Sequence, residues 1–235
     1  MTTFALVHGA WHGAWCWEHL TPLLRQRGHR VIAPELPCDD PSATFDDYAD
    51  VVCAALGDRD DVDHQDVVAV GHSLGGHTIP LVAARRPIRH LVYLAALVPQ
   101  IGTSLRDQMR AEPDMLNPMS RQALSRPDEQ RRNAWIDEAL TTELLFGDAE
   151  PATAHTAFAR LRPQALHPYS VPFTLEDFPP TGRTYVVCTG DQMVNPAWSR
   201  QVASERLDAG LIELPGDHSP FLSRAAELAD LLTGV

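Results

Sequence analysis

The segment Val67 to Leu81, VVAVGHSLGGHTIPL, constrains the fold of this chain more than any other stretch. Four apolar residues, Val67 to Val70, predict a short buried strand, and the residues after the glycines can be helical as far as Arg86. Between them stands Gly71-His72-Ser73-Leu74-Gly75, a serine with a glycine two residues to either side. A strand, a tight turn that carries serine and a helix together form the nucleophile-elbow pattern.

The glycines of this pattern have a physical role. A serine on a sharp turn has a strained backbone that a neighbouring chain must approach closely, and glycine allows the approach because it lacks a Cβ. The helix after Ser73 points free N–H groups and the positive end of its dipole at the turn, which favours a developing oxyanion. A surface turn could carry these residues by chance, but the flanking strand and helix favour the interpretation of Ser73 as a nucleophile.

Further short apolar runs alternate with helical patterns along the chain. The other β-type runs are Phe4 to Val7, Val31 to Ala33, Leu91 to Leu97, Tyr185 to Cys188 and Leu211 to Leu214. The alternation predicts an α/β fold, with a mostly parallel sheet of about six strands covered by helices on both faces. Two local expectations concern helices: Pro80 should kink the helix after Ser73, and one last helix should run from Pro220 through Leu232.

Residues 100–183 differ in character from the rest. They combine helical segments, many prolines and scattered large apolar residues without a clear β-type run, and a structureless connection of this length would be anomalous. We predict a helical cap inserted into a core of residues 1–99 and 184–235; an ordinary part of the core is the alternative. His12 of the first loop and Trp135, Phe146 and Phe158 of the cap are predicted to line a substrate pocket.

The overall charge and the cysteines narrow the function classes. The 235 residues hold 19 Lys and Arg against 31 Asp and Glu, a formal net charge of -12, which argues against nucleic acid or an anionic membrane as partner. Cys16, Cys38, Cys53 and Cys188 have no metal-binding spacing, so we expect thiols in a reducing, cytoplasmic compartment. The start of the chain shows no signal-peptide pattern, and the acidic stretch Asp58 to Asp66 is expected to be a solvated loop.

A serine nucleophile needs a base, and the base needs an orienting carboxylate. His218 lies directly after the last predicted strand, and Asp191 follows the strand before it, both at crevice positions. The chain order Ser73, Asp191, His218 is the one expected of this architecture. Asp217 is the alternative acid, but a residue adjacent to His218 cannot easily turn back to its ring. The remaining histidines at element ends or in the insertion are expected to be solvated or structural: His29, His64, His90, His155 and His167.

Five segments, spread over both ends of the chain, together resemble the α/β-hydrolase superfamily. They are Ala5 to Trp17 (ALVHGAWHGAWCW), Gly71 to Gly76 (GHSLGG), Leu94 to Pro99 (LAALVP), Cys188 to Asp191 (CTGD) and Gly216 to His218 (GDH). They are most similar to the serine-esterase branch that holds plant methyl esterases, hydroxynitrile lyases and many bacterial esterases. The resemblance implies Ser73 as nucleophile, His218 as base and Asp191 as acid. It implies the backbone N–H groups of Ala10 and Leu74 as oxyanion hole.

The resemblance implies an enzyme that cleaves a small to medium carboxylic ester through an acyl-enzyme, without a cofactor or a metal. Two alternatives share the scaffold: a hydroxynitrile lyase and a receptor-like protein that binds a small molecule. The lyases of this branch carry Lys directly after the catalytic histidine, where this chain has Ser219. The crevice segments contain no Lys or Arg, although Arg160 and Arg162 of the cap could supply the charge. The sequence leaves open whether the chain forms a homodimer.

Overall fold

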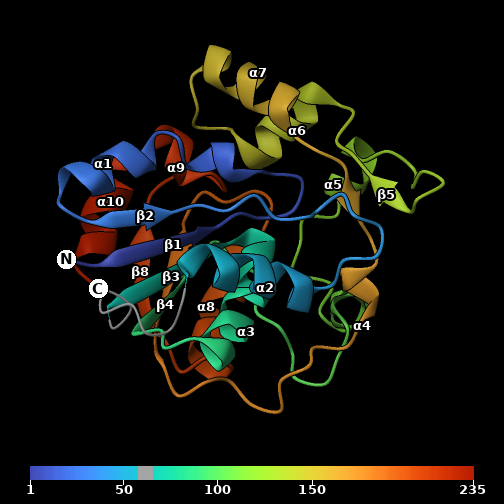
Figure 1. Ribbon diagram of the computed structural model, residues 1–235. Coiled ribbons are helices and arrows are strands. Elements are labelled where there is room, and N and C mark those ends of the chain that lie inside the picture. Colours follow the sequence, from blue (N-terminus) through green and yellow to red (C-terminus); the bar gives the residue numbers. More distant parts are fainter. Residues whose placement is uncertain (58–65) are drawn as a thin grey trace.

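The computed structural model describes residues 1–57 and 66–235 (Figure 1). Within these residues the chain forms a six-stranded sheet in the order β2-β1-β3-β4-β7-β8, and each neighbouring pair runs parallel. The strands are β1 (Thr3–Val7), β2 (Arg30–Ile32), β3 (Val67–His72), β4 (His90–Leu94), β7 (Gly182–Cys188) and β8 (Gly210–Leu214). The predicted α/β sheet is therefore confirmed. The expected acidic loop lies outside the described residues except for Asp66, as does His64.

The central strands β1, β3, β4 and β7 are largely buried on both faces, and their side chains alternate between two apolar clusters, whereas most of the edge strand β8 is exposed. In β1, Phe4 and Leu6 belong to one cluster, whereas Ala5 and Val7 belong to the other. Successive side chains of a strand point to opposite faces, so a strand covered on both sides is apolar throughout. This is why the strands appear in the sequence as continuous apolar runs.

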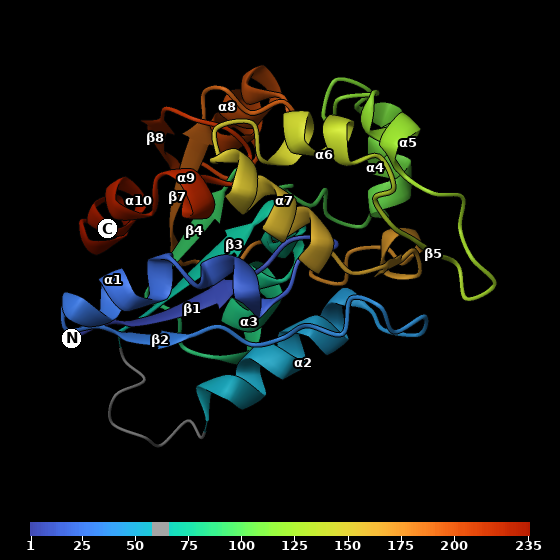
Figure 2. The ribbon, with the colours of Figure 1, turned by 90° about the horizontal axis from the view of Figure 1, so that it is seen from above.

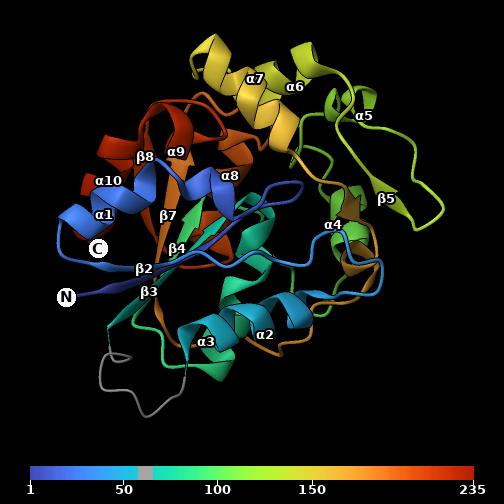
Figure 3. The same cartoon turned by 45° about the horizontal axis from the view of Figure 1, so that its top comes forward.

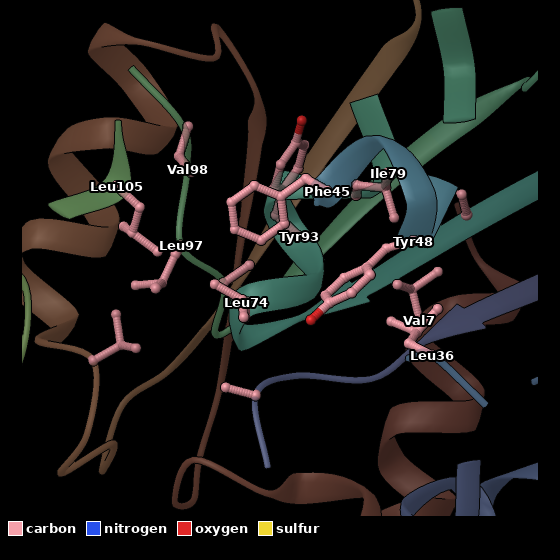
Figure 4. Packing of buried hydrophobic residues seen from close by; sticks show 14 of the residues in the cluster. Val7, Leu36, Phe45, Tyr48, Leu74, Ile79, Tyr93, Leu97, Val98 and Leu105 are labelled. Atoms are coloured by element: carbon pink, nitrogen blue, oxygen red, sulfur yellow. The ribbon is translucent and has the colours of Figure 1, made fainter. Parts of the chain in front are cut away.

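Helices cover each face (Figure 3). On one face lie α1 (Leu20–Gln26) and α10 (Ala225–Thr233), whose Leu20, Leu24 and Leu228 join the cluster of Phe4. The opposite face is covered by three helices: α2 (Phe45–Leu56), α3 (Ile79–Arg85) and α8 (Pro196–Glu205). Figure 4 shows part of the cluster on this face, where Phe45 and Ile79 of the helices accompany Leu74 and Tyr93. Helix α2 begins at a capping box in which Thr44 and Asp47 bond each other's backbone N–H.

Two helix predictions are wrong in detail. After Ser73 the chain forms a 3-10 helix, η3 (Ser73–His77), and α3 begins only at Ile79. Pro80 therefore lies in the first turn of α3, where its missing N–H costs no helical bond, and it starts the helix instead of kinking it. The single predicted last helix is divided into α9 (Pro220–Ser223) and α10, because Arg224 between them leaves helical geometry at φ -135°.

The segment between β4 and β7 holds four helices among its described residues: α4 (Leu105–Ala111), α5 (Ser120–Ala123), α6 (Glu138–Leu145) and α7 (Pro151–Arg160). It also holds an antiparallel pair that the sequence did not predict, β5 (Arg132–Asn133) with β6 (Gln164–Ala165). Two short 3-10 helices complete the structure, η1 (Ala14–Trp17) and η4 (Pro168–Ser170). Figures 1 and 2 show α4, α5 and α6 gathered at the end of the sheet toward which the strands run.

The helices of the two described ranges lack the combination of length and apolar character needed to cross a membrane. Cys16, Cys38, Cys53 and Cys188, all of them described residues, are buried, and none of them forms a disulfide.

Candidate active site

Ser73 stands at the junction of β3 and η3 in the left-handed region, with φ 51°. This conformation is strained for a residue with a Cβ and is often associated with functional sites. A Cβ on Gly71 would lie 2.7 Å from the carbonyl oxygen of Gly75, and one on Gly75 would lie 2.6 Å from that of Val7. Both obstacles are backbone atoms that cannot move aside, so the turn that presents Ser73 requires both glycines.

His218 and Asp191 form a buried pair at the carboxyl ends of β8 and β7. The Nδ1–H of His218 donates to Oδ2 of Asp191 at 2.8 Å, and the two side chains are 1% and 3% exposed. The other carboxylate oxygen of Asp191 accepts the backbone N–H groups of Met193, at 2.7 Å, and Val194, at 2.9 Å. A carboxylate only accepts, so it fixes the proton on Nδ1 and leaves Nε2 of His218 with its lone pair.

A third histidine connects this pair to the turn that carries the serine. His72, the residue before Ser73, donates its Nε2–H to the backbone oxygen of His218 at 2.9 Å, and the two imidazole rings are 4.7 Å apart. The phenyl ring of Phe221 packs edge-on against His72 at 4.8 Å. The structure thus brings the loop of the candidate base against the turn of the candidate nucleophile.

The other buried histidines of this region hold backbone groups. The Nδ1–H of His8 donates to the oxygen of Gly9, and that of His12 donates to the oxygen of Ala10. Burial lowers the pKa of His8 to about 4 and that of His12 to about 3, and it lowers the pKa of His72 well below its usual value. These imidazoles are therefore neutral at pH 7. Unlike these rings, the ring of His218 bonds a carboxylate, that of Asp191, instead of a backbone oxygen.

Asp217 faces away from the imidazole of its neighbour. One of its oxygens accepts the backbone N–H of Asp148 at 2.9 Å, and the other accepts that of Ser219 at 3.0 Å. Burial raises the pKa of the Asp217 carboxyl above its usual value. The geometry therefore favours Asp191 over Asp217 as the partner of His218, as the sequence analysis expects.

We expect Asp191→Asn to lower kcat/KM for an ester about 10³-fold to 10⁴-fold, whereas Asp217→Asn lowers it less than tenfold. An amide at position 191 presents an N–H to the imidazole and reverses its tautomer, so Nε2 loses its lone pair. Asp217→Asn is the matched control because it makes the same change in a buried carboxylate one residue from His218. Steady-state kinetics of both variants, with melting temperatures to confirm folding, tests the assignment. Equal losses would contradict it.

The loop after β1 lies against Ser73. A Cβ on Gly9 would lie 2.8 Å from the Cβ of Ser73, and Ala10 and Leu74 border the same cavity as the serine. Trp11, with φ 61°, donates its indole N–H to Asn133 at 3.1 Å. These positions agree with the oxyanion hole expected from the N–H groups of Ala10 and Leu74, which remains a proposal.

The insertion anchors this loop through residues that the sequence analysis missed. Gln164 of β6 accepts the backbone N–H of Trp11 at 3.4 Å and donates to the hydroxyl of Tyr48 at 3.1 Å. Asn133 of β5 holds the indole of the same tryptophan. Each strand of this pair is two residues long, too short for a periodic signal, so no sequence pattern could have placed Gln164 or Asn133 at the site.

A cavity of about 420 Å³ opens beside Ser73. Its apolar wall includes Leu97, Met109, Met115, Leu124, Leu166 and Met193. The predicted pocket residues His12, Trp135, Phe146 and Phe158 are not part of this wall, so that expectation is corrected. Three of them belong to the packing of the loop and the insertion: Trp135 contacts the ring of Trp11 at 5.3 Å, and Phe146 contacts His12 at 6.0 Å. Phe158 packs against the main apolar cluster.

The arginines that border this cavity differ from those that the sequence suggested. Arg160 forms an ion pair with Glu18 at 2.7 Å, and Arg162 forms one with Asp39 at 2.5 Å and another with Glu35. Neither lines the cavity, whereas Arg106 and Arg121 do.

Comparisons with known proteins decide the family. Residues 4–231 match the model of the alpha/beta hydrolase family. The chain belongs to the alpha/beta hydrolase family. It is 29% identical to the probable esterase PIR7A of rice (Oryza sativa) over an alignment of 255 positions, gaps included, which covers 97% of this chain and 94% of that protein.

Two further similarities bear on the possible activities. An alpha-hydroxynitrile lyase of Arabidopsis thaliana is 41% identical over 105 residues, but the match covers only 41% of this chain and 40% of that protein. Among solved structures, a pyrethroid hydrolase from Sphingobium faniae superposes with a TM-score of 0.83 at 25% identity, covering 99% of this chain and 96% of that one. The α/β-hydrolase fold therefore spans nearly the whole chain.

Proposed function

We propose that this member of the alpha/beta hydrolase family is a serine esterase that cleaves a carboxylic ester of small to medium size. The observation that carries the proposal is the buried bond between His218 and Asp191, which orients a base beside a strained serine turn. The full-length similarity to the rice protein named a probable esterase supports the same reaction class.

The proposed reaction has two halves. His218 Nε2 takes the proton of Ser73 while Oγ attacks the ester carbonyl carbon, and the resulting oxyanion is held by the N–H groups of Ala10 and Leu74. The tetrahedral intermediate collapses, the C–O bond to the alcohol breaks, and His218 returns the proton to the leaving alcohol. Water then attacks the acyl-enzyme through the same base and releases the acid and free Ser73.

The lyase alternative rests on the partial similarity to the Arabidopsis protein. In this chain Ser219 follows His218, and its hydroxyl is buried without a hydrogen-bond partner among the described residues. The cations near the cavity, Arg106 and Arg121, belong to α4 and α5 and not to the loops that carry the serine and the histidine. These features favour ester hydrolysis over release of cyanide from a cyanohydrin.

Three assays on purified protein separate the function classes. We expect a fluorophosphonate probe to label Ser73 covalently, a short aryl ester to be turned over, and mandelonitrile to remain uncleaved above background. The wild-type chain and Ser73→Ala are compared in each assay, with peptide mass spectrometry to locate the label. Labelling without turnover of any ester would favour a binding protein, and Ser73-dependent cyanide release would favour a lyase.

A further inference from the structure

The side chains that border the cavity differ in whether their hydrogen-bonding groups are already engaged within the protein. Three of its wall residues carry a side-chain carbonyl or carboxylate: Glu112, Asn117 and Asn133. The carboxylate of Glu112 accepts from the guanidinium of Arg206 and from the indole N–H of Trp198, each at 2.7 Å. Both of its oxygens are thus already engaged by groups outside the wall.

The two asparagine oxygens are engaged as well. Oδ1 of Asn117 accepts the backbone N–H of Met119 at 3.0 Å, and Oδ1 of Asn133 accepts the indole N–H of Trp11 at 3.1 Å. The hydroxyl of Ser120 donates to the backbone oxygen of Asn117 at 2.8 Å. A ligand that needs side-chain carbonyl or carboxylate acceptors would have to share an oxygen that already accepts one of these bonds.

The unengaged polar groups of the wall are donors. Neither the guanidinium of Arg106 nor that of Arg121 forms a salt bridge or hydrogen bond within the described part of the chain, and both border the cavity. Asp107, the carboxylate next to Arg106 in sequence, is bonded to Ser104 and Arg110. Burial raises the pKa of Tyr169 well above its usual value, so this phenol also keeps its proton.

The charge at the cavity is therefore opposite in sign to that of the molecule. Glu112 forms an ion pair with Arg206, and Arg106 and Arg121 add two positive charges to the wall of a chain whose net charge is -12, although the charge of Arg106 also acts on the carboxylate of Asp107. Arg106 lies in the first turn of α4, and Arg121 lies on α5. Figures 1 and 2 show both helices at the end of the sheet toward which the strands run. Both arginines border the same cavity.

We infer that this site selects esters that carry a second, anionic group, a carboxylate joined through an apolar chain to the scissile ester. The methionine and leucine side chains of the wall accommodate the apolar chain, and Arg106 and Arg121 bind the remote carboxylate. The inference rests on the proposed esterase function and specifies its substrate class.

A pair of substrates that differ only in charge tests this specificity. Monomethyl suberate carries a terminal carboxylate, and methyl suberamate replaces it by a carboxamide of nearly equal size. We expect wild-type kcat/KM to favour the carboxylate about tenfold, the effect of two partly solvated ionic contacts. The ratio should decrease as added salt screens the charges.

The double variant Arg106→Gln, Arg121→Gln should reduce this ratio to about one, because the loss of the two charges lowers kcat/KM for monomethyl suberate more than for methyl suberamate. Arg126→Gln, Arg131→Gln is the matched control, because it removes the same charge from two exposed arginines of the insertion that do not border the cavity. A wild-type ratio at or below one, or an equal ratio in both double variants, would overturn the inference.

Failure of the esterase proposal can be distinguished from failure of the anion-site inference. If wild-type protein hydrolyses neither ester, the esterase proposal fails, and calorimetric binding of octanoate and octanamide tests the anion site separately. Stronger binding of octanoate, lost in the Arg106→Gln, Arg121→Gln variant and kept in the control, would support the anion site. Equal binding of the two probes would contradict it.

Discussion

Replacing Ser73 by alanine should abolish ester hydrolysis, with a loss in kcat on the order of 10⁵-fold to 10⁶-fold, while the fold survives. The substitution removes only the hydroxyl group, and without this group no acyl-enzyme forms. The backbone turn at φ 51° is kept because alanine retains the Cβ, and the close approaches of Gly71 and Gly75 do not involve the hydroxyl. Stability should therefore change little.

The measurement is turnover of a short aryl ester, with thermal unfolding of the same preparations. Ser204→Ala is the matched control, because Ser204 is an exposed serine of α8 that does not border the cavity. Activity of Ser73→Ala within tenfold of the wild type would show that Ser73 is not the nucleophile. A large loss of ester turnover in the control variant as well would indicate that the protein preparations were damaged.

The sequence could predict the centre of the site because its determinants are local. The strand before Ser73, the two glycines and the positions of Asp191 and His218 after strands depend on short segments whose burial and turn geometry restrict the residue types. Parallel strands then bring their carboxyl ends to one edge. The sheet order brings the carboxyl ends of β3, β7 and β8 to one edge, where His218 bonds Asp191 and His72, the neighbour of Ser73, bonds the backbone oxygen of His218.

The cavity wall could not be predicted in the same way. Trp135 and Phe146 are large apolar residues of the insertion, as a pocket would require, yet they are 6% and 0% exposed and serve as packing for Trp11 and His12. Residues buried in the core and residues that line a cavity are of the same apolar types, so only the tertiary packing distinguishes them. The bonds of Gln164 and Asn133 to Trp11 span more than one hundred residues, beyond the reach of any periodic pattern.

Lowering the pH from 7 to 5 should destabilise this protein steeply, because the folded chain buries several histidines in their neutral form. Burial lowers the pKa from 6.5 to about 4 in His8 and to about 3 in His12 and His77, and it also lowers that of His72 well below 6.5. In the unfolded chain these groups return to about 6.5. Below pH 6.5 the unfolded state therefore binds protons that the folded state excludes.

The sign follows from linkage: where the unfolded state binds more protons, the free energy of unfolding increases with pH. The stabilisation is complete above pH 6.5 and is lost as the pH falls toward the folded-state values. The slope is roughly 1.4 kcal/mol per pH unit for each such histidine once its unfolded form is protonated. Asp217 acts in the opposite direction, because its raised pKa makes the folded state bind a proton more readily, but it is one group against four.

From pH 7 to pH 5 the loss is roughly 1.9 kcal/mol per histidine, or about 7.5 kcal/mol for the four. A domain stable by only about 5 to 15 kcal/mol would lose much of its stability in this range. Urea unfolding at pH 7, 6 and 5 measures the slope. His77→Gln should reduce it by about one proton. Stability that is constant from pH 7 to pH 5 would mean that the four imidazoles titrate alike in the folded and the unfolded chain.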